Sequence, residues 1–555
     1  MASIPVIVKH QGKKYEVEVD PESTGEVFKF QLYSLTGVEP DRQKVLLKSI
    51  LKDDTPMSKF NLKPGQTIMM MGTPAGDANT LVRPAEPVKF LEDMTEAEAA
   101  RQLGAIPAGL SNLGNTCYLN STLQALRAIP ELQDALSKYE PPSASSTGTL
   151  PQLDLTRQLR DTYKYMSETQ EAYVPHTFLA ALRDLYPQFA ERSRTGAGFA
   201  QQDAEEAWSQ ILSQIRQKLR VKDASDATSD ASFIEKYMSG QFTSELVCDE
   251  LGAVEAGEKP VVSKDGFLKL NCHIDSSTNH LRDGIVNGLK EKLEKRSEVL
   301  GREATYTKTS KITRLPKYLT VHFVRFFWKR ETQKKAKIMR KVTFPHELDV
   351  VEFCDDNLKK LLVPVRDKVR EIRKEVEDVE RARKRRKRIA EGDDDGLGGS
   401  SSKKKDDKKD QKKGGADGDV EMTETYKTDA EIDAERDAQV LAMKKELSAL
   451  IDSDLVKDEG ANQSGLYELR GVVTHQGASA DSGHYTAYVK KTAPVDPKTG
   501  KRLEEDGKWW WFNDDKVTEV ESDKIDALAG GGESHSALIL LYKAIQLPTA
   551  ENAST

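Results

Sequence analysis

Cys117 is the residue whose surroundings best suit a nucleophile. It follows a polar, glycine-containing turn at 112–116, and the apolar residues after it recur at helical spacing, at Leu119, Leu123 and Leu126. This pattern predicts that Cys117 begins a helix. The free N–H groups of a first helical turn favour a thiolate, which is the attacking form of cysteine. On these residues alone, a buried and unreactive cysteine remains the alternative.

A thiolate nucleophile needs a base, and the chain has nine histidines. His484 ends a loop of small residues at 476–483 and opens a segment that alternates like a strand. Its ring could therefore project beside a bound backbone. His475, at the other end of the loop, is the rival, and a structural hydrogen bond is the alternative role for it.

Asn513 and Asp514 directly follow an aromatic strand-like run at 509–512. A carboxamide or carboxylate there could hold an imidazole in the correct tautomer, as the third member of a catalytic triad does. These segments lie far from Cys117 in the sequence, so spacing alone cannot bring them together.

Composition restricts the remaining chemistry. Hydrophobic residues make up 37% of the 555 residues, charged residues 31%, and the net charge is −7, which gives no overall attraction to nucleic acid or anionic membranes. The four cysteines form no CxxC pair, so neither a disulfide scaffold nor a four-cysteine zinc site is expected. The sequence has neither the pattern of a signal peptide nor a long apolar span. We therefore expect a soluble protein of a reducing compartment.

The first 72 residues have the element order of a β-grasp domain. Strand-like runs at 4–8 and 15–19 flank a turn at Gly12, and two further short runs lie at 45–47 and 68–71. A helix is expected between the two pairs of strands, with an apolar face containing Val27, Phe30, Leu32 and Leu35. Residues 73–104, rich in Ala, Pro, Gly and Glu, are interpreted as a flexible linker.

A charged insertion at 366–452 divides the globular region into 105–365 and 453–545, and a polar tail at 546–555 follows. The two ends of the insertion are predicted to form helices that could pair. The apolar stripes of these helices contain Val369, Ile372, Val376 and Val379 in the first, and Val440, Met443, Leu447 and Leu450 in the second. Between the helices, the tip at 391–427 has too few apolar residues to order itself. The basic run Arg381–Arg388 could be an import signal or a nucleic-acid patch, but such runs are more often solvated helix ends.

These motifs resemble those of the ubiquitin-specific proteases, a papain-like family of deubiquitinases. The cysteine box at 109–124, the histidine box at 477–488 and four shorter segments match the family in order. The shorter segments are 201–204, 315–319, 325–326 and 540–542. The first 72 residues resemble ubiquitin itself, although the terminal Gly-Gly of ubiquitin is missing. Together the two parts are most similar to family members that carry a ubiquitin-like domain and associate with the proteasome.

The resemblance implies an α+β architecture, with a β-grasp domain followed by a papain-like catalytic domain of thumb, palm and fingers. It implies thiol-dependent hydrolysis after the C-terminal glycine of ubiquitin, on proteasome-bound substrates, so that ubiquitin is recycled. Cys117 would be the nucleophile, His484 the general base and acid, and Asn112 the oxyanion donor. Asn513 would orient His484, where some members carry Asp, and Asp514 is a candidate helper.

The resemblance also implies sites for binding. Gln202, Asp203 and Tyr485 would bind the ubiquitin tail, and loops at 327–338 and 476–483 would cover the groove of the free enzyme. Leu46, Met69 and Met71 would dock on the 26S proteasome, the alternative being that they pack on the chain's own catalytic domain. Many relatives bind zinc in the fingers, but only Cys248 and Cys272 lie there, so no metal and no cofactor is expected.

The implied partners are ubiquitin, ubiquitinated proteins and the proteasome, in the cytoplasm and nucleus, with no membrane and with nucleic acid unfavoured. Two other functions were weighed. An inactive scaffold would lack the cysteine or the histidine, and both are present. An enzyme for another ubiquitin-like modifier would be distinguished by a panel of substrates.

Overall fold

A computed structural model describes most of the chain, and it separates into two compact units, Met1–Asp93 and Met94–Thr555. The described residues are 3–10, 13–47, 50–72, 106–141, 153–193, 198–222, 230–329, 334–391, 429–479, 482–493 and 505–548. The predicted linker at 73–104 and the predicted tip at 391–427 therefore lie almost entirely outside them. No helix in these ranges is long and apolar enough to span a membrane.

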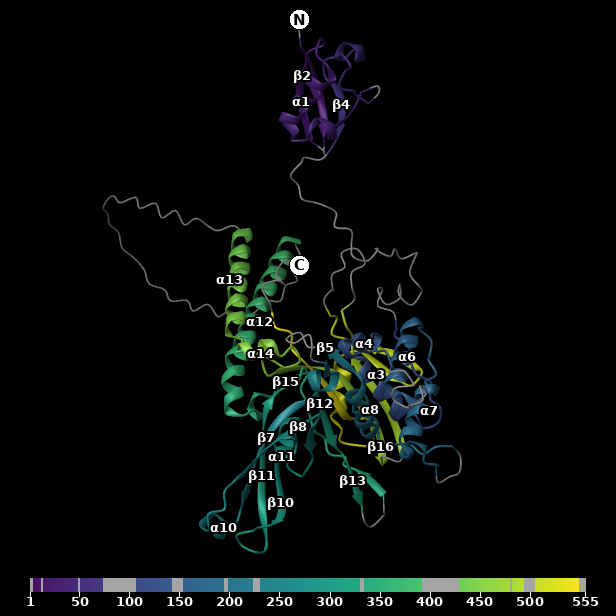
Figure 1. Cartoon of the computed structure of the whole chain (residues 1–555), viewed down its shortest axis with the longest axis vertical. Helices are drawn as coiled ribbons and strands as arrows, with labels where there is room; N and C mark the ends of the chain where they lie inside the picture. Colours follow the sequence, from purple (N-terminus) through teal and green to yellow (C-terminus); the bar gives the residue numbers. More distant parts are fainter. Residues whose placement is uncertain are drawn as a thin grey trace, which may run out of the picture. The chain divides into compact units, whose positions relative to one another are not determined.

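The first unit contains a four-stranded sheet in the order β2-β1-β4-β3 with one helix packed on it (Figure 1). The two outer pairs are antiparallel and β1 runs parallel to β4, which is the topology of the predicted β-grasp domain. Its elements are β1 (Ile4–His10), β2 (Lys13–Val19), α1 (Gly25–Thr36), β3 (Lys44–Leu46) and β4 (Gln66–Met71).

The prediction of which residues form the apolar face of α1 was partly wrong. The helix buries Phe28 and Leu32, whereas Val27, Phe30 and Leu35 are exposed. Lys29 also turns inward, because its ammonium pairs with the Asp53 carboxylate at 2.6 Å. The buried face of α1 thus includes a charged residue and excludes Phe30.

The second unit begins with a group of helices, here called the thumb, around one large apolar core. They are α3 (Cys117–Arg127), α4 (Pro130–Ser137), α6 (Leu155–Glu168), α7 (His176–Leu185), α8 (Ala204–Lys218) and α9 (Phe233–Tyr237). Two small strands follow α8, β5 (Arg220–Lys222) and β6 (Asp230–Ser232). Helix α3 packs against a ten-stranded sheet, so the thumb core and the sheet share residues such as Val473 and Tyr485.

That sheet is the palm, and its main path runs β19-β18-β17-β16-β20-β12-β9. Its strands are β9 (Leu270–His273), β12 (Tyr318–Val324), β13 (Phe326–Lys329), β14 (Lys334–Lys337), β15 (Glu347–Asp349), β16 (Leu466–Ser479), β17 (Ser482–Lys490), β18 (Trp509–Asn513), β19 (Lys516–Val520) and β20 (Ser536–Ala544). Helices α11 (Leu281–Leu289) and α15 (Asp523–Asp526) accompany it. The histidine and aromatic segments predicted from the sequence thus become neighbouring strands β17 and β18.

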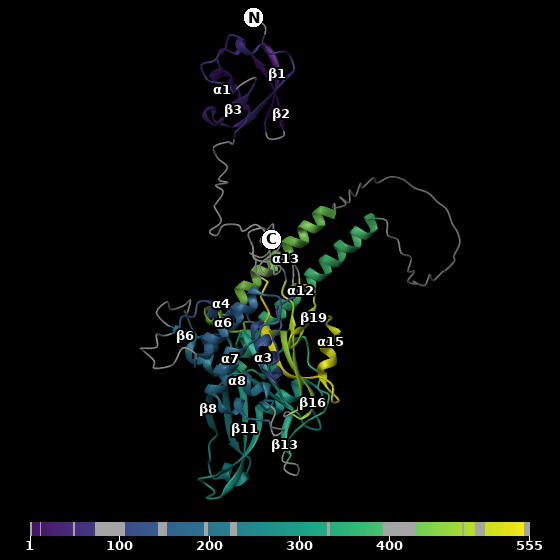
Figure 2. The same cartoon turned by 90° about the vertical axis from the view of Figure 1, so that its right-hand side faces the viewer.

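A separate four-stranded sheet, the fingers, extends from the palm in the order β10-β11-β7-β8 (Figures 1 and 2). Its strands are β7 (Gly240–Cys248), β8 (Val261–Phe267), β10 (Lys290–Arg296) and β11 (Glu303–Arg314), with α10 (Leu251–Glu255) at the far end. Cys248 packs in a small core of the fingers, whereas Cys272 lies in the palm core.

The predicted helices of the insertion both form and pack against each other as an arm (Figure 2). They are α12 (Asp356–Glu391) and α13 (Asp429–Leu450), and the short α14 (Ser453–Lys457) follows. Lys368 pairs with Glu446 and Arg383 with Asp437, so the two helices run antiparallel. Part of the basic run therefore faces acidic side chains of α13.

We expect the arm to depend on its apolar seam. Leu447 is buried between the helices, whereas Leu450, which the sequence pattern placed on the same apolar stripe, is 40% exposed, so that part of the prediction was wrong. Leu447→Ala should destabilise the arm by about 3 kcal/mol, because it removes buried methyl groups and leaves a cavity. Hydrogen exchange of the α13 amides measures this. Leu450→Ala is the matched control and should have little effect; equal effects would contradict the observed seam.

Candidate active site

Cys117 is the first residue of α3, as the sequence predicts, and its thiol is 2% exposed. Helix α3 packs against β17, which contains His484. The backbone N–H of Tyr485 is hydrogen-bonded to the Cys117 thiol, so the strand after His484 contacts the helix start directly. The two segments that the resemblance paired are therefore adjacent in space, although 367 positions separate Cys117 from His484 in the sequence.

His484 is held by the neighbouring strand. Its Nε2 atom lies 2.6 Å from Oδ1 of Asn513, the last residue of β18. An amide oxygen can only accept a hydrogen bond, so Nε2 carries the hydrogen and Nδ1 has the free lone pair. Asn513 therefore selects the tautomer of His484 in which Nδ1 can act as a base.

Asp514 connects the segments around the thiol. One carboxylate oxygen accepts a hydrogen bond of 2.9 Å from the side-chain amide of Asn112, and the other accepts one of 2.8 Å from that of Asn120 in α3. The side-chain oxygen of Asn112, Oδ1, in turn accepts hydrogen bonds from the backbone N–H groups of Gly114 and Thr116. The turn before Cys117 and the first turn of α3 are thus fixed to the same carboxylate.

The backbone of Asp514 forms a second part of this connection. It lies in the two-residue turn between β18 and β19 with φ 50°, a left-handed conformation that Asp tolerates better than most residues. Its carbonyl accepts a 2.9 Å hydrogen bond from the N–H of Leu110. A Cβ on Gly109 would lie 2.6 Å from the carbonyl oxygen of Asp515, so only glycine allows this approach.

Burial, not the helix start, controls the thiol. Desolvation raises the pKa of Cys117 to about 11, and the negative charge of Asp514 acts in the same direction. Hydrogen bonds from the backbone N–H groups of Tyr485 and Tyr118 oppose the shift but do not cancel it. Within the described residues, the thiol forms no hydrogen bond with His484. The expected thiolate was therefore wrong for this structure.

His475, the rival base, is buried. Its ring is fully buried between those of Phe326 and Tyr485, and burial together with the charge of Lys337 lowers its pKa to about 3. So weak a base has little tendency to take a proton from a thiol. The backbone carbonyl of His475 accepts a hydrogen bond from Lys337 Nζ at 2.6 Å, which ties β14 to β16.

The residues predicted to bind the ubiquitin tail have different surroundings. Asp203 caps α8 by accepting a hydrogen bond from the backbone N–H of Glu205, and Gln202 beside it is half-buried. The Tyr485 ring is 1% exposed, so this residue reaches the site through its backbone. Of the two predicted covering loops, the described parts are joined by pairing of Ala336 with Ser479.

Sequence reasoning missed Asn120 and Gly109. Asn120 is one of several polar side chains that α3 buries, and a run of polar residues inside an otherwise apolar helix could have marked a hydrogen-bond network. Among the described residues no cluster of histidine, cysteine and acidic side chains is suited to a metal ion.

Comparison with known proteins agrees with this geometry. The family model described as ubiquitin carboxyl-terminal hydrolase matches residues 108–542, which include the segments around Cys117, His484 and Asn513. The chain belongs to the ubiquitin carboxyl-terminal hydrolase family. The ubiquitin family model matches residues 6–75, in agreement with the β-grasp unit.

Similar hydrolases extend along almost the whole chain. Ubiquitin carboxyl-terminal hydrolase 6 of Schizosaccharomyces pombe is 43% identical over 98% of this chain and 99% of its own. Ubiquitin carboxyl-terminal hydrolase 6 of Arabidopsis thaliana is 38% identical over 97% and 98%. Ubiquitin carboxyl-terminal hydrolase 14 of Caenorhabditis elegans is 31% identical over 98% and 94%. The predicted family, fold class and thiol-dependent hydrolase activity are therefore confirmed.

We predict that the thiol of the free hydrolase is poorly reactive at neutral pH. Because its pKa is raised to about 11, the thiolate fraction, and with it the rate of alkylation of Cys117 by iodoacetamide, should rise about tenfold per pH unit from pH 7 to pH 10. Mass spectrometry of the Cys117 peptide measures the rate. Cys272 and Cys354, whose pKa values burial raises to about 12, are internal controls. A plateau below pH 9 would contradict the shift.

A second prediction ranks the residues beside the thiol. Asn513 orients His484 without adding charge, so Asn513→Ala should lower kcat on the order of tenfold, and His484→Ala on the order of a thousandfold. Cys117→Ala should abolish turnover. The measurement is kcat on a fluorogenic amide of ubiquitin. Equal losses from Asn513→Ala and His484→Ala would show that orientation is indispensable, or that another residue supplies it.

Proposed function

We propose that Cys117, His484 and Asn513 form the catalytic triad of this hydrolase. The observation that carries the proposal is the 2.6 Å contact between His484 Nε2 and Asn513 Oδ1, on strands packed beside the start of α3. In the reaction, His484 Nδ1 takes the thiol proton and the sulfur attacks the carbonyl of ubiquitin's last glycine. The imidazolium then gives that proton to the departing amine, and a thioester remains. Water, deprotonated by His484, hydrolyses the thioester and frees the thiol.

We propose that the Asn112 side chain donates a hydrogen bond to the oxyanion that forms during the reaction. Its amide nitrogen has two hydrogens, and one is committed to Asp514, so the other can point to the developing charge. A fixed donor of this kind is often worth about 3 kcal/mol of transition-state stabilisation. Asp514 acts here as a positioning residue, because it fixes the donor instead of touching the substrate.

Because the pKa of Cys117 is raised, we propose that binding of ubiquitin helps to activate the thiol. The thiol and His484 are not hydrogen-bonded in the free enzyme, so proton transfer requires a further approach of the two side chains. Binding of the ubiquitin tail beside Cys117 and His484 would supply that approach. Gln202 and Asp203, at the start of α8, are proposed as polar contacts for the arginine-bearing tail.

We further propose that the β-grasp unit binds the proteasome and that the hydrolase recycles ubiquitin from substrates there, in the cytoplasm and nucleus. Leu46, Met69 and Met71 lie on neighbouring strands and are 38%, 54% and 52% exposed. Adaptable methionines beside a leucine suit a partner surface. We call these three residues the docking face. Relatives along the whole chain keep both units, which supports a common task for them.

Deleting residues 1–72 should abolish co-purification with proteasomes and leave hydrolysis of the fluorogenic ubiquitin amide within a few-fold, because no active-site residue lies there. Met69→Glu should lower recovery of proteasomes by roughly tenfold by placing a charge on the docking face. The matched control is Phe30→Glu, on the exposed side of α1.

Full proteasome binding by the truncated enzyme would reject the docking role and assign the contact to the catalytic unit. A loss from Phe30→Glu but not from Met69→Glu would place docking on the helix. Turnover that changes with Met69→Glu in the absence of proteasomes would favour packing of the docking face on the chain's own catalytic unit.

A further inference from the structure

The fingers join the rest of the catalytic unit through unusually direct connections. Strand β11 ends at Arg314 and the palm strand β12 begins at Tyr318, so only residues 315–317 lie between the two sheets. On the thumb side, Met238 and Ser239 alone separate α9 from β7. Because β7 and β11 are the inner strands of the fingers, the contacts at this junction influence the direction in which the fingers extend.

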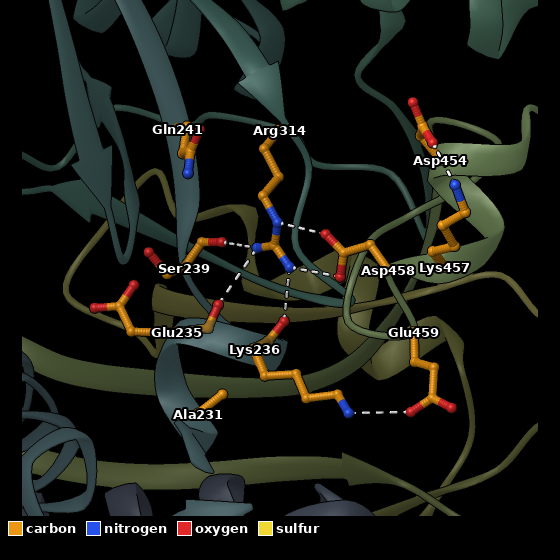
Figure 3. A pocket seen from close by; sticks show the side chains of 10 residues that line it. All are labelled: Ala231, Glu235, Lys236, Ser239, Gln241, Arg314, Asp454, Lys457, Asp458 and Glu459. Atoms are coloured by element: carbon orange, nitrogen blue, oxygen red, sulfur yellow. Dashed lines mark hydrogen bonds and ion pairs between the residues drawn. The ribbon is translucent and has the colours of Figure 1, made fainter. Parts of the chain in front are cut away.

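Arg314 occupies this junction and contacts both sides of it (Figure 3). Its guanidinium donates two hydrogen bonds, of 2.8 and 2.9 Å, to the carboxylate of Asp458. It also donates to the carbonyls of Lys236, at 2.9 Å, of Glu235 and of Ser239. These carbonyls lie at the end of α9 and at the start of the fingers, where a cation satisfies groups that the helix leaves unpaired.

The returning chain of the insertion is fixed at the same place. Gly460 accepts a 2.7 Å hydrogen bond from the N–H of Lys317, in the connection between the sheets. A Cβ on Gly460 would lie 1.8 Å from the carbonyl oxygen of Lys236, so the backbone packs directly on α9. Glu459 pairs with Lys236 Nζ at 3.1 Å. Residues 458–460 therefore bind thumb, fingers and palm together.

The entry of the insertion is attached to the same strand. The N–H of Asp355, just before α12, donates a 2.9 Å hydrogen bond to the carbonyl of Ile312 in β11. The segments that flank the insertion, at Asp355 and at 458–460, thus both contact residues 312–317. These polar contacts line one surface cavity of about 410 Å³, and none of its lining residues is among those described around Cys117, so they have no direct part in the chemistry.

We propose that the pair Arg314–Asp458, the hinge clasp, sets the orientation of the fingers toward the thumb and thereby the affinity for the folded part of ubiquitin. This inference rests on the proposed function. The fingers supply none of the side chains described around Cys117, and we infer that they contact the folded part of ubiquitin. The clasp residues are positioning residues, and their effect should appear in KM rather than in kcat.

The test is Asp458→Asn, which keeps the size of the side chain and removes its charge. On the fluorogenic amide of whole ubiquitin, KM should rise about three- to tenfold with kcat within twofold of wild type. On a fluorogenic amide of a short peptide with ubiquitin's last residues, kcat/KM should not change, because that substrate does not reach the fingers. Asp458→Glu keeps the charge and should restore most of the affinity.

Glu505→Gln is the matched control, since Glu505 also accepts two hydrogen bonds from an arginine, Arg470, but on the palm. If Asp458→Asn does not fold, Arg314→Lys gives a milder break, because a lysine cannot reach both Asp458 and the α9 carbonyls.

An unchanged KM with a lower melting temperature would overturn the proposal and leave the clasp a structural contact. A parallel loss on the peptide would overturn it by placing the effect at the catalytic centre. A wild-type enzyme inactive on ubiquitin amide would instead reject the proposed function.

Discussion

The active site depends on one carboxylate. Asp514 is the common acceptor for Asn112 in the loop before the nucleophile and Asn120 in the helix that begins with it. Its own position is fixed by the turn after β18, the strand that also supplies Asn513. Helix, loop and sheet meet at this residue, so the distance between the thiol and the imidazole is determined by the packing of three elements around a single charge.

That arrangement has a chemical cost. A negative charge near a thiol disfavours the thiolate, and here it adds to the larger effect of burial. The partial charge of a helix start is equivalent to about half an elementary charge and acts only over the first turn. Removal of the thiolate from water outweighs it. The carboxylate that fixes the side chain of Asn112 thus also disfavours ionisation of the Cys117 thiol.

Local patterns in the sequence were sufficient for the elements and for the order of the motifs. The start of α3 at Cys117, the alternation of Met69 and Met71 along β4, and the paired helices of the insertion all follow from periodicity. The contact between Asn120 and Asp514 joins residues 394 positions apart, and no local pattern encodes it. The face of α1 was misjudged for a related reason, because Lys29 is buried only by virtue of its partner Asp53.

The resting state of Cys117 also affects how the enzyme withstands oxidants. Peroxide attacks the thiolate, and sulfenic acid is the first step of a sequence that becomes irreversible at the sulfinic stage. A thiol that is 2% exposed and has a pKa near 11 offers almost none of that species to the solvent. Burial thus shields Cys117 from peroxide in the free protein. Under the proposed mechanism the thiolate forms only when a bound substrate already covers the sulfur, so the oxidant and the reactive form of the thiol seldom meet.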